Sequence, residues 1–372
     1  MVRYLSIAKS WKVGLLCSAV LLSACATTPS ASTSTTLSVE PTFGTLRLWT
    51  ISHSVDGLYS VVYLDPYWLV FNQQDPTSKW KLKMPTNISS RRGIVLATNG
   101  SGVKAVGFIP YQGQKNTVVF EYGTNGAFQP SFIDASLLTS NQSMNYDGGD
   151  LFAIATSGSR TLIEDQSQSG GQFIQVASFP FASTNGAIGF SGSNGIAIFS
   201  SADGKVAMST SSDGGKSWSN LTPVTSSGTT QEIFVASSSQ SSTQASLNSP
   251  NFVVVTSSSS NSYQSSFFSA GSKGTSIDTS TPPIFGDGPN GALLEVDGAI
   301  GGTLTQRVFT QGALSQPSTL QGVQGGLEAI YGDASSTTVI TTANGLPTSY
   351  SAPAGSDSFG ASSSFDVSAL NG

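Results

Sequence analysis

Carboxylates in or near predicted strands are the residues of this sequence best suited to acid–base chemistry. A carboxylate buried in a strand is costly unless it has a partner or a catalytic task. Two carboxylates that face each other across a cleft can hydrolyse a glycosidic bond, one as acid and the other as base or nucleophile. For most of the carboxylates in this sequence, an outer, solvated strand position is the simpler explanation. No pair of them has a sequence signature, so the sequence assigns no catalytic residue. The candidates are Glu121, Glu164, Asp165, Glu232, Glu295 and Asp297.

The single histidine, His53, lies three residues before Asp56 and could belong to a catalytic triad. No nucleophile elbow in a strand-turn-helix context accompanies it, so a polar loop histidine is the favoured interpretation. One histidine and no cysteine in the folded domain leave too few ligands for a transition-metal centre. Calcium could use Asp147, Asp150 or Asp287, but no EF-hand or nonapeptide pattern surrounds them. We therefore expect no metal and no cofactor.

The elements that must position these residues are short strands. Apolar runs rich in Val, Ile and Phe are interrupted every few residues by Gly, Asn or Ser, as in Leu151–Thr156, Gly195–Phe199 and Asn251–Thr256. No sustained 3.6-residue periodicity follows the N-terminal segment, so we expect an all-β domain. The Ser/Gln-rich stretches Ser237–Ser249 and Ser257–Ser266 are expected to be long exposed connections.

The N-terminal segment has the layout of a secretory signal. Three basic residues precede an apolar stretch over 13–22, which is too short to span a membrane as a helix. The following Leu22-Ser23-Ala24-Cys25 resembles the lipobox of bacterial lipoproteins, which implies a signal peptide over 1–24 and lipidation of Cys25. Residues 25–42 form a Ser/Thr/Pro-rich tether. We expect a lipid-anchored protein on the extracytoplasmic side of the membrane; a secretory signal without lipidation is the alternative.

The charge balance narrows the choice of partners. Charged residues make up only 10% of the chain, against roughly 25% in average soluble domains. Cleavage of the signal would remove three basic residues and change the formal net charge from −5 to −8. This balance argues against nucleic acid as a partner, because phosphate binding needs a cationic face. The neutral polar surface suits an acidic exterior, and it suits an ordinary secreted β-protein equally well.

One turn sequence indicates how the strands are assembled. Residues 211–218, Ser-Ser-Asp-Gly-Gly-Lys-Ser-Trp, fit the pattern Ser-x-Asp-x-Gly-x-x-Trp that begins at Ser211. Asp213 can accept backbone N–H bonds across the turn, Gly215 can adopt the positive φ that closes it, and Trp218 can bury its ring on the hairpin. We expect these four residues to have a structural role.

Weaker copies of this turn recur upstream. One keeps the interval from Asp75 to Trp80 but has Thr77 in place of the glycine, and two further copies end at Phe128 and Phe173. A period of about 45 residues with several short strands per unit predicts a β-propeller over 43–372. About seven blades fit this length, with six or eight as alternatives. The period is carried by Trp80, Phe128, Phe173 and Trp218, spaced by 48, 45 and 45 residues.

Closure of this ring is expected to involve both ends of the domain. Pairing of the run Thr45–Thr50 with a strand near Ser363–Leu370 would leave no open sheet edge.

The motif and its period resemble the Asp-box, or BNR-repeat, β-propellers. That superfamily includes sialidases, other glycoside hydrolases, sortilin-like receptors and assembly factors of photosystem II. In these families the box lies on the blade periphery, which implies a structural role. Sialidases also need an arginine triad with an Arg-Ile/Leu-Pro motif. Here Arg47-Leu48-Trp49 lacks the proline, and a set of Arg47, Arg160 and Arg307 rests on spacing alone, so sialidase activity is not expected.

Basic residues concentrate in the first predicted blade, within fourteen positions. On one rim of the blade they would form a cationic patch for an anionic partner or lipid headgroups. A solvated strand face is the simpler interpretation, and we favour it. The residues are Lys79, Lys81, Lys83, Arg91 and Arg92.

Taken together, these patterns favour a membrane-anchored β-propeller that acts as a non-catalytic binding or assembly module. Loops from several blades can contact an envelope protein or a glycan without any catalytic group. A cell-surface glycoside hydrolase is the first alternative, and it would need two facing carboxylates flanked by aromatics such as Trp49, Tyr67 or Trp68. A structural cell-envelope protein is the second alternative.

Overall fold

The structure is a computed structural model, and all of its described residues lie in one compact unit, Phe43–Gly372. They are 47–54, 57–64, 67–72, 79–83, 105–110, 117–122, 128–133, 136–138, 142–147, 150–166, 172–224, 226, 228–237, 249–259, 262–269, 272–298, 302–332, 334–343, 346–360 and 363–364. Side chains are described only between 138 and 360. The predicted signal and tether, over 1–42, lie outside these residues. Within them, no helix has the length and apolar character needed to cross a membrane.

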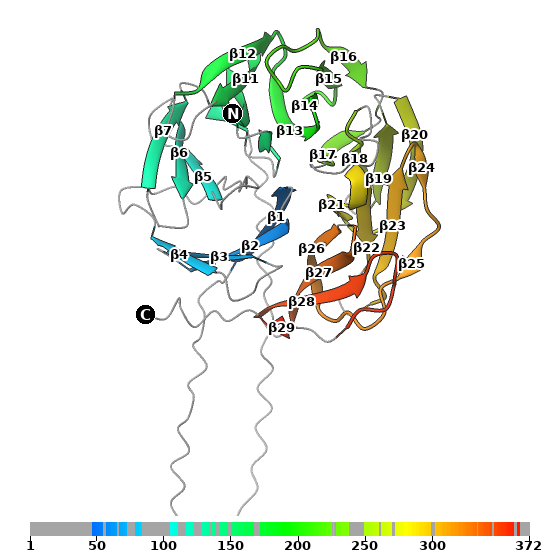
Figure 1. Cartoon of the computed structure of the whole chain (residues 1–372). Coiled ribbons are helices and arrows are strands. Elements are labelled where there is room, and N and C mark those ends of the chain that lie inside the picture. Colours follow the sequence, from blue (N-terminus) through cyan, green and yellow to red (C-terminus); the bar gives the residue numbers. More distant parts are fainter. Residues whose placement is uncertain are drawn as a thin grey trace, which may run out of the picture. The chain divides into compact units, whose positions relative to one another are not determined.

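The described strands pair into seven antiparallel sheets, which we number I to VII in chain order (Figure 1). Sheet I consists of β1 (Arg47–Ser54), β2 (Gly57–Leu64), β3 (Tyr67–Asn72) and β4 (Lys79–Lys83). Sheet II consists of β5 (Ala105–Pro110), β6 (Thr117–Tyr122) and β7 (Phe128–Ile133). Sheet III consists of β8 (Ser136–Leu137), β9 (Met144–Asp147), β10 (Asp150–Ser157), β11 (Arg160–Gln166) and β12 (Ile174–Phe179).

The rest of the chain continues this arrangement. Sheet IV consists of β13 (Ser183–Ser191), β14 (Asn194–Ser201), β15 (Val206–Ser211) and β16 (Thr222–Val224). Sheet V consists of β17 (Thr229–Val235), β18 (Phe252–Ser259), β19 (Ser262–Ser269) and β20 (Ser272–Thr279). Sheet VI consists of β21 (Ile284–Asp287), β22 (Leu293–Asp297), β23 (Thr305–Thr310), β24 (Ala313–Leu314) and β25 (Ser318–Thr319), and the 3-10 helix η1 (Pro289–Gly291) connects β21 to β22. Sheet VII consists of β26 (Gly326–Gly332), β27 (Ser336–Ala343), β28 (Leu346–Pro353) and β29 (Ser363–Ser364).

Each sheet is built from strands that are consecutive in the sequence. Two sheets depart from a simple meander: β8 and β9 pair with different halves of β10, and β24 and β25 share β23 in the same way. Consecutive up-and-down sheets of about four strands are the units of a β-propeller. The predicted all-β propeller fold is thereby confirmed. The prediction of an exposed connection over Ser257–Ser266 is wrong, because this stretch supplies the end of β18 and the start of β19, where Ser265 and Ser266 are buried.

Ring closure differs from the prediction. β1 pairs with β2, and β29 pairs with β28, so among the described strands none of sheet I joins sheet VII. The predicted pairing of Thr45–Thr50 with Ser363–Leu370 is therefore wrong for this part of the chain. The reason is that the C-terminal region supplies all four strands of sheet VII itself. The first and last sheets meet instead through a contact between β1 and β26.

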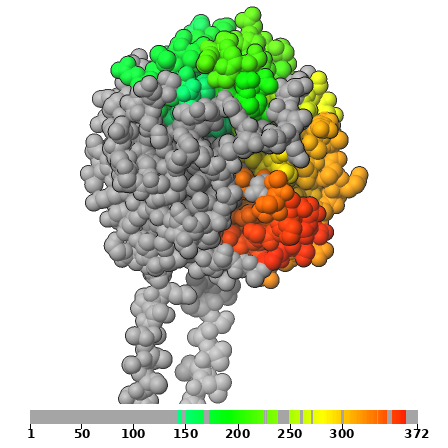
Figure 2. Space-filling view, viewed as in Figure 1, coloured from blue at the N-terminus to red at the C-terminus, as the bar shows by residue number. Residues whose placement is uncertain are grey.

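The sheets of the second half are buried on both faces. Leu293 of β22 packs with Phe234 and Phe267 of sheet V, whereas the next residue, Leu294, packs with Ile330 of sheet VII. Successive residues of a strand point to opposite faces, so a sheet between two others needs apolar residues at nearly every position. This explains why the strands read as continuous apolar runs. Figure 2 shows sheets III to VII following one another in colour order from green to red.

The predicted repeat matches the order of strands in the sheets. Trp80 lies on β4 and Phe128 begins β7, while Phe173 and Trp218 precede β12 and β16. Each of the four aromatics therefore lies on, or just before, the last strand of sheets I to IV. The period of about 45 residues is the distance from one outermost strand to the next.

First strands of neighbouring sheets approach closely at two glycines. A Cβ added to Gly189 of β13 would lie 2.5 Å from Val235 Cγ1 of β17. A Cβ added to Gly286 of β21 would lie 1.7 Å from the backbone oxygen of Ile330 on β26. Only glycine fits at such distances, so these two positions set how closely the sheets converge.

Gly286→Ala should destabilise the domain by about 3 kcal/mol, because the methyl group collides with a backbone oxygen that cannot move without shifting β26. Gly360→Ala is the matched control, since its added Cβ would lie at an ordinary 3.5 Å from Ser351 O, and its effect should stay within about 0.5 kcal/mol. Urea unfolding of both variants measures the difference. Equal midpoints for the two variants would contradict the close approach.

Candidate functional site

The 211–218 turn connects β15 to β16 through hydrogen bonds made by two side chains. The backbone N–H of Gly215 donates to Ser211 Oγ at 2.9 Å, and Ser211 Oγ donates to Asp213 Oδ1 at 2.8 Å. Asp213 also accepts from the backbone N–H of Ser217 at 3.0 Å and from Ser217 Oγ at 2.5 Å. These donors lower the pKa of Asp213 to about 2. The turn is closed by positive φ angles of 71° at Gly214 and 81° at Gly215.

The tryptophan of this turn folds back onto it. Trp218 Nε1 donates to Gly215 O at 2.8 Å, and the half-buried ring meets Phe190 edge to face with centroids 6.2 Å apart. The turn also contacts the neighbouring sheet, because a Cβ on Gly215 would lie 2.5 Å from Phe152 of β10. Phe152 and Phe190 belong to one core cluster between sheets III and IV. The turn is therefore part of the junction between these two sheets.

Two aspartates lie at this same junction. Asp165 of β11 is opposite Phe152 in the register of sheet III, and Asp150 lies two residues before Phe152 on β10. Residues opposite each other or two apart share a face of a sheet, so both aspartates face the turn. Burial and the charge of Asp150 raise the pKa of Asp165 to about 6. Burial also raises the pKa of Asp150, although Lys216 of the turn opposes this effect.

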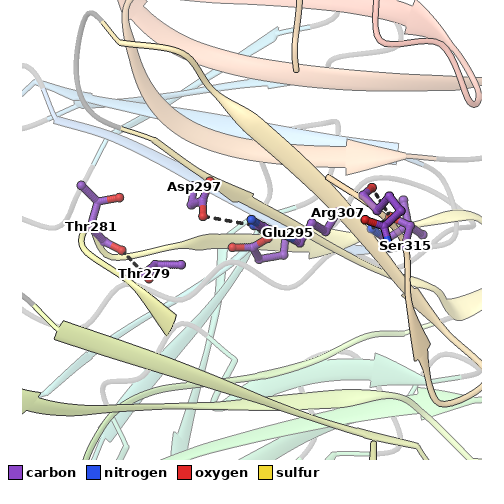
Figure 3. A network of polar contacts seen from close by, with 8 residues as sticks. Thr279, Thr281, Glu295, Asp297, Arg307 and Ser315 are labelled. Carbon is purple, nitrogen blue, oxygen red and sulfur yellow. Dashed lines mark hydrogen bonds and ion pairs between the residues drawn. The ribbon is translucent and has the colours of Figure 1, made fainter. Parts of the chain in front are cut away.

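A second charged cluster joins three residues that the sequence singled out. Arg307 Nη1 of β23 donates to Glu295 Oε2 at 2.9 Å and to Asp297 Oδ2 at 3.1 Å, both on β22 (Figure 3). Glu295 is opposite Arg307 in the register, and Asp297 follows on the same face of the strand. One guanidinium therefore serves two carboxylates.

The raised pKa of Glu295 would suit a general acid, but its side chain is not accessible to a substrate. Burial raises its pKa to about 7, against the opposing hydrogen bond from Arg307. Its side chain is fully buried, and Oε1 has no hydrogen-bond partner among the described residues. A glycan cannot reach this carboxylate unless sheets V and VI separate. The cluster, with Asp297 and Arg307 each 18% exposed, is thus better suited to holding sheet VI together than to hydrolysis.

The other candidates are dispersed. Glu164 lies on the face of β11 opposite to Asp165, and burial raises the pKa of Glu232 on β17 to about 7. Arg160 donates a hydrogen bond to Ser178 within sheet III, and Arg307 binds Glu295 and Asp297 within sheet VI, so each of these two arginines has partners in its own sheet. Asp287 accepts a hydrogen bond from the backbone N–H of Ser237 at 2.8 Å.

Several predicted positions cannot be placed. Cys25, Asp75, Asp56, Arg91 and Arg92 lie outside the described residues. Others lie on strands described by backbone alone, so nothing is said of their side chains. They are Arg47, Trp49 and His53 on β1, Tyr67 and Trp68 on β3, Lys79, Trp80, Lys81 and Lys83 on β4, Glu121 on β6 and Asp147 on β9.

One group of polar residues escaped the sequence analysis. Gln142, between β8 and β9, bonds both backbone groups of Val235: Nε2 donates to Val235 O at 2.9 Å, and Oε1 accepts from Val235 N at 2.5 Å. Asn145 Nδ2 donates to Ile188 O at 3.1 Å and to Ser237 Oγ at 2.9 Å. These side chains connect sheet III to sheets IV and V. No motif marks them, since their partners are 43 to 93 residues away.

Comparison with known proteins supports the fold. No family model matches the sequence, and no curated protein matches it. The chain is similar in structure to the β-propeller domain of the trilobed protease from Pyrococcus furiosus, with 8% identity over 86% of this chain and 98% of that chain and a TM-score of 0.50. It is also similar to hydrazine synthase from Kuenenia stuttgartiensis, with 9% identity over 80% and 94% of the two chains and a TM-score of 0.54.

The chain is also similar to a structure from a study of two prolyl endopeptidases, with 11% identity and a TM-score of 0.53. The match covers 84% of this chain and 48% of that chain. At such low identity these likenesses show the fold alone. With the sheet topology described above, they establish that this chain is a β-propeller.

Trp218→Ala should destabilise the domain by about 3 kcal/mol, because it empties a site in the cluster between sheets III and IV and removes the bond to Gly215 O. Thermal unfolding followed by circular dichroism measures the loss. Ser212→Ala, an exposed change within the same turn, serves as the control. Identical unfolding of the two variants would show that the ring of Trp218 contributes nothing to the junction.

Stability should rise as the pH falls from 7.5 to 5. The pKa values of Glu295 and Asp165 are about 7 and about 6 in the folded protein, above their ordinary values of 4.5 and 3.8. The folded state therefore binds more protons than the unfolded state between about pH 7 and pH 4, so protonation favours folding in this range. Unfolding midpoints at the two pH values test this expectation. Glu295→Gln should weaken the pH dependence, and a midpoint that fell toward pH 5 would refute it.

Proposed function

We propose that this chain is an extracytoplasmic, membrane-anchored lipoprotein whose β-propeller is a non-catalytic binding or assembly module. The observation that carries the proposal is the succession of seven similar sheets, each with its own connecting loops. If each sheet is one blade, loops of adjacent blades form a continuous surface on which a protein or glycan can be held by many weak contacts. The lipobox sequence ending at Cys25 supports anchoring of this surface at the membrane.

The charge clusters support a binding role over a catalytic one. The carboxylates with the largest rise in pKa include Glu295 and Asp165, and both are buried where sheets meet. Buried carboxylates with raised pKa values adjust the stability of the ring, whereas a hydrolase needs them on the wall of an open cleft. The sequence concentrates cationic residues between Lys79 and Arg92, and a patch formed by them would suit an anionic envelope partner.

A glycoside hydrolase is the second candidate. It is favoured by one observation, namely that Glu295 and Asp297 bind the same nitrogen of Arg307 and that the pKa of Glu295 is about 7. In such an enzyme sheets V and VI would have to separate to admit the glycan, and Glu295 would then act as the acid and Asp297 as the base or nucleophile. Release of shortened glycan by the wild type, and its loss in Glu295→Gln, would establish this role.

The full chain, tagged at its C-terminus and produced in the source organism, should remain with the membrane and crosslink to a stoichiometric envelope partner. Cys25→Ser should move the protein to the soluble fraction, because the lipid supplies the anchor. Membrane fractionation followed by mass spectrometry of the crosslinked species gives both results.

The charge-reversed variants Lys81→Glu and Arg91→Glu distinguish a cationic contact from other surfaces. Both should reduce crosslinking at physiological salt if the patch is used, while Lys273→Glu, an exposed change on sheet V, should not. A wild-type chain that stays in the soluble fraction would contradict anchoring. Crosslinking to no partner would contradict the binding role.

A further inference from the structure

The connection from β15 to β16 ends in the sequence Asn220-Leu221-Thr222. An Asn-x-Ser/Thr sequence without proline in the middle is the acceptor for N-linked glycosylation in exported proteins. Asn220 and Thr222 are both exposed, whereas Leu221 between them is half-buried and packs on the core cluster between sheets III and IV. Among the described residues, neither the carboxamide of Asn220 nor the hydroxyl of Thr222 has a hydrogen-bond partner. Both groups that a glycosyltransferase must recognise therefore face the solvent together.

The backbone on either side of Leu221 is held in place by β15. Ser219 N–H donates to Thr210 O at 2.8 Å, and Ser209 Oγ donates to Ser219 O at 2.7 Å. Thr222 begins β16 and is the register partner of Met208. The fold thus presents the acceptor sequence at a fixed place, beside the last strand of sheet IV. A bulky polar group attached there would displace no contact of the folded chain.

The chain has three other sequences of this kind, and the one that the structure partly describes is not suited to modification. In Asn141-Gln142-Ser143, the second and third residues are buried, and the glutamine binds both backbone groups of Val235. A transferase cannot reach the serine hydroxyl in the folded chain, and a glycan beside this contact would prevent sheets III and V from packing. The other two, Asn87-Ile88-Ser89 and Asn99-Gly100-Ser101, lie outside the described residues.

We propose that Asn220 carries an N-linked glycan in the exported protein. The donor would be an oligosaccharide joined to a membrane lipid through a phosphate. Asn220 Nδ2 forms a bond to the anomeric carbon of the first sugar while the bond from that carbon to the phosphate oxygen breaks. The lipid phosphate leaves with the electron pair, and the amide nitrogen gives up one proton, so no oxidant or reductant is needed. The inference rests on the extracytoplasmic location proposed above, because the chain must meet the lipid-linked sugar and its transferase outside the cytoplasm.

The place of the glycan suggests what it does for the domain. Among the described strands, β16 pairs only with β15, so its other edge is open. An open edge can pair with a strand of another chain, and many proteins prevent this with charged side chains. Charged residues are only 10% of this chain. A hydrated glycan next to β16 would block the approach of a second chain without adding charge.

The test uses the full chain purified from the source organism, digested with chymotrypsin and analysed by mass spectrometry. The peptide that contains Asn220 should be heavier than its sequence by the mass of whole sugar residues. Asn220→Gln and Thr222→Ala should each abolish this added mass, because the first removes the acceptor nitrogen and the second removes the hydroxyl that the transferase recognises. Thr222→Ser should keep the glycan. Ser212→Ala, an exposed change in the same connection but outside the acceptor sequence, should keep it as well.

Further variants separate this inference from the proposed anchoring. Cys25→Ser removes the lipid but leaves the export signal, so the glycan on Asn220 should remain. Deletion of residues 2–24 should abolish the glycan, because the chain then stays away from the transferase. A wild-type chain that fractionates with the membrane but has an unmodified Asn220 would overturn the glycan inference and leave anchoring intact. A soluble wild-type chain with sugar on Asn220 would support the glycan inference and contradict anchoring. Added mass that persists on this peptide in Asn220→Gln would overturn the assignment to Asn220.

Discussion

The close approach of neighbouring sheets is the constraint on which the rest of this structure depends. Gly189 and Gly286 let the first strands of adjacent sheets meet at distances where no Cβ fits. Sheets that converge in this way bury both faces, so apolar side chains alternate between two clusters along one strand. Polar groups that remain inside must then find partners in the next sheet, as Gln142 and Asn145 do.

The same constraint explains the unusual carboxylates. A charged side chain between two sheets loses its hydration, and only hydrogen-bond donors or opposite charges on the facing sheet can replace it. In sheet VI, one nitrogen of Arg307 donates to two carboxylates. The 211–218 turn, which faces Asp165, provides no hydrogen-bond donor to Asp165 Oδ1. The raised pKa values of Glu295 and Asp165 thus follow from their places in the sheets. Asp213, exposed and surrounded by donors within its own turn, shows the opposite shift.

The fold could be predicted from local sequence patterns, whereas contacts between residues far apart in the sequence could not be predicted. The turn at 211–218 and the spacing of Trp80, Phe128, Phe173 and Trp218 predicted strands, repeat and propeller, because hydrogen bonds and aromatic packing within one sheet are encoded over a few residues. The charged cluster of Glu295, Asp297 and Arg307 was visible only as single candidates, since the register of β22 and β23 decides which of them meet. The predicted ring closure is absent among the described strands, because the sequence does not show that Ser363–Ser364 pairs within its own sheet.

The seam between β1 and β26 has a mechanical consequence. Sheets I and VII are each built from their own strands in the described part of the chain, so the ring has no strand shared across its ends. Tension applied to the N-terminus reaches β1 directly and is opposed there by the β1–β2 ladder within sheet I and by contact with β26. The hydrogen bonds between β1 and β2 would then break one after another, as in peeling. Sheet I would be the first to detach, while the sheets after it remain joined.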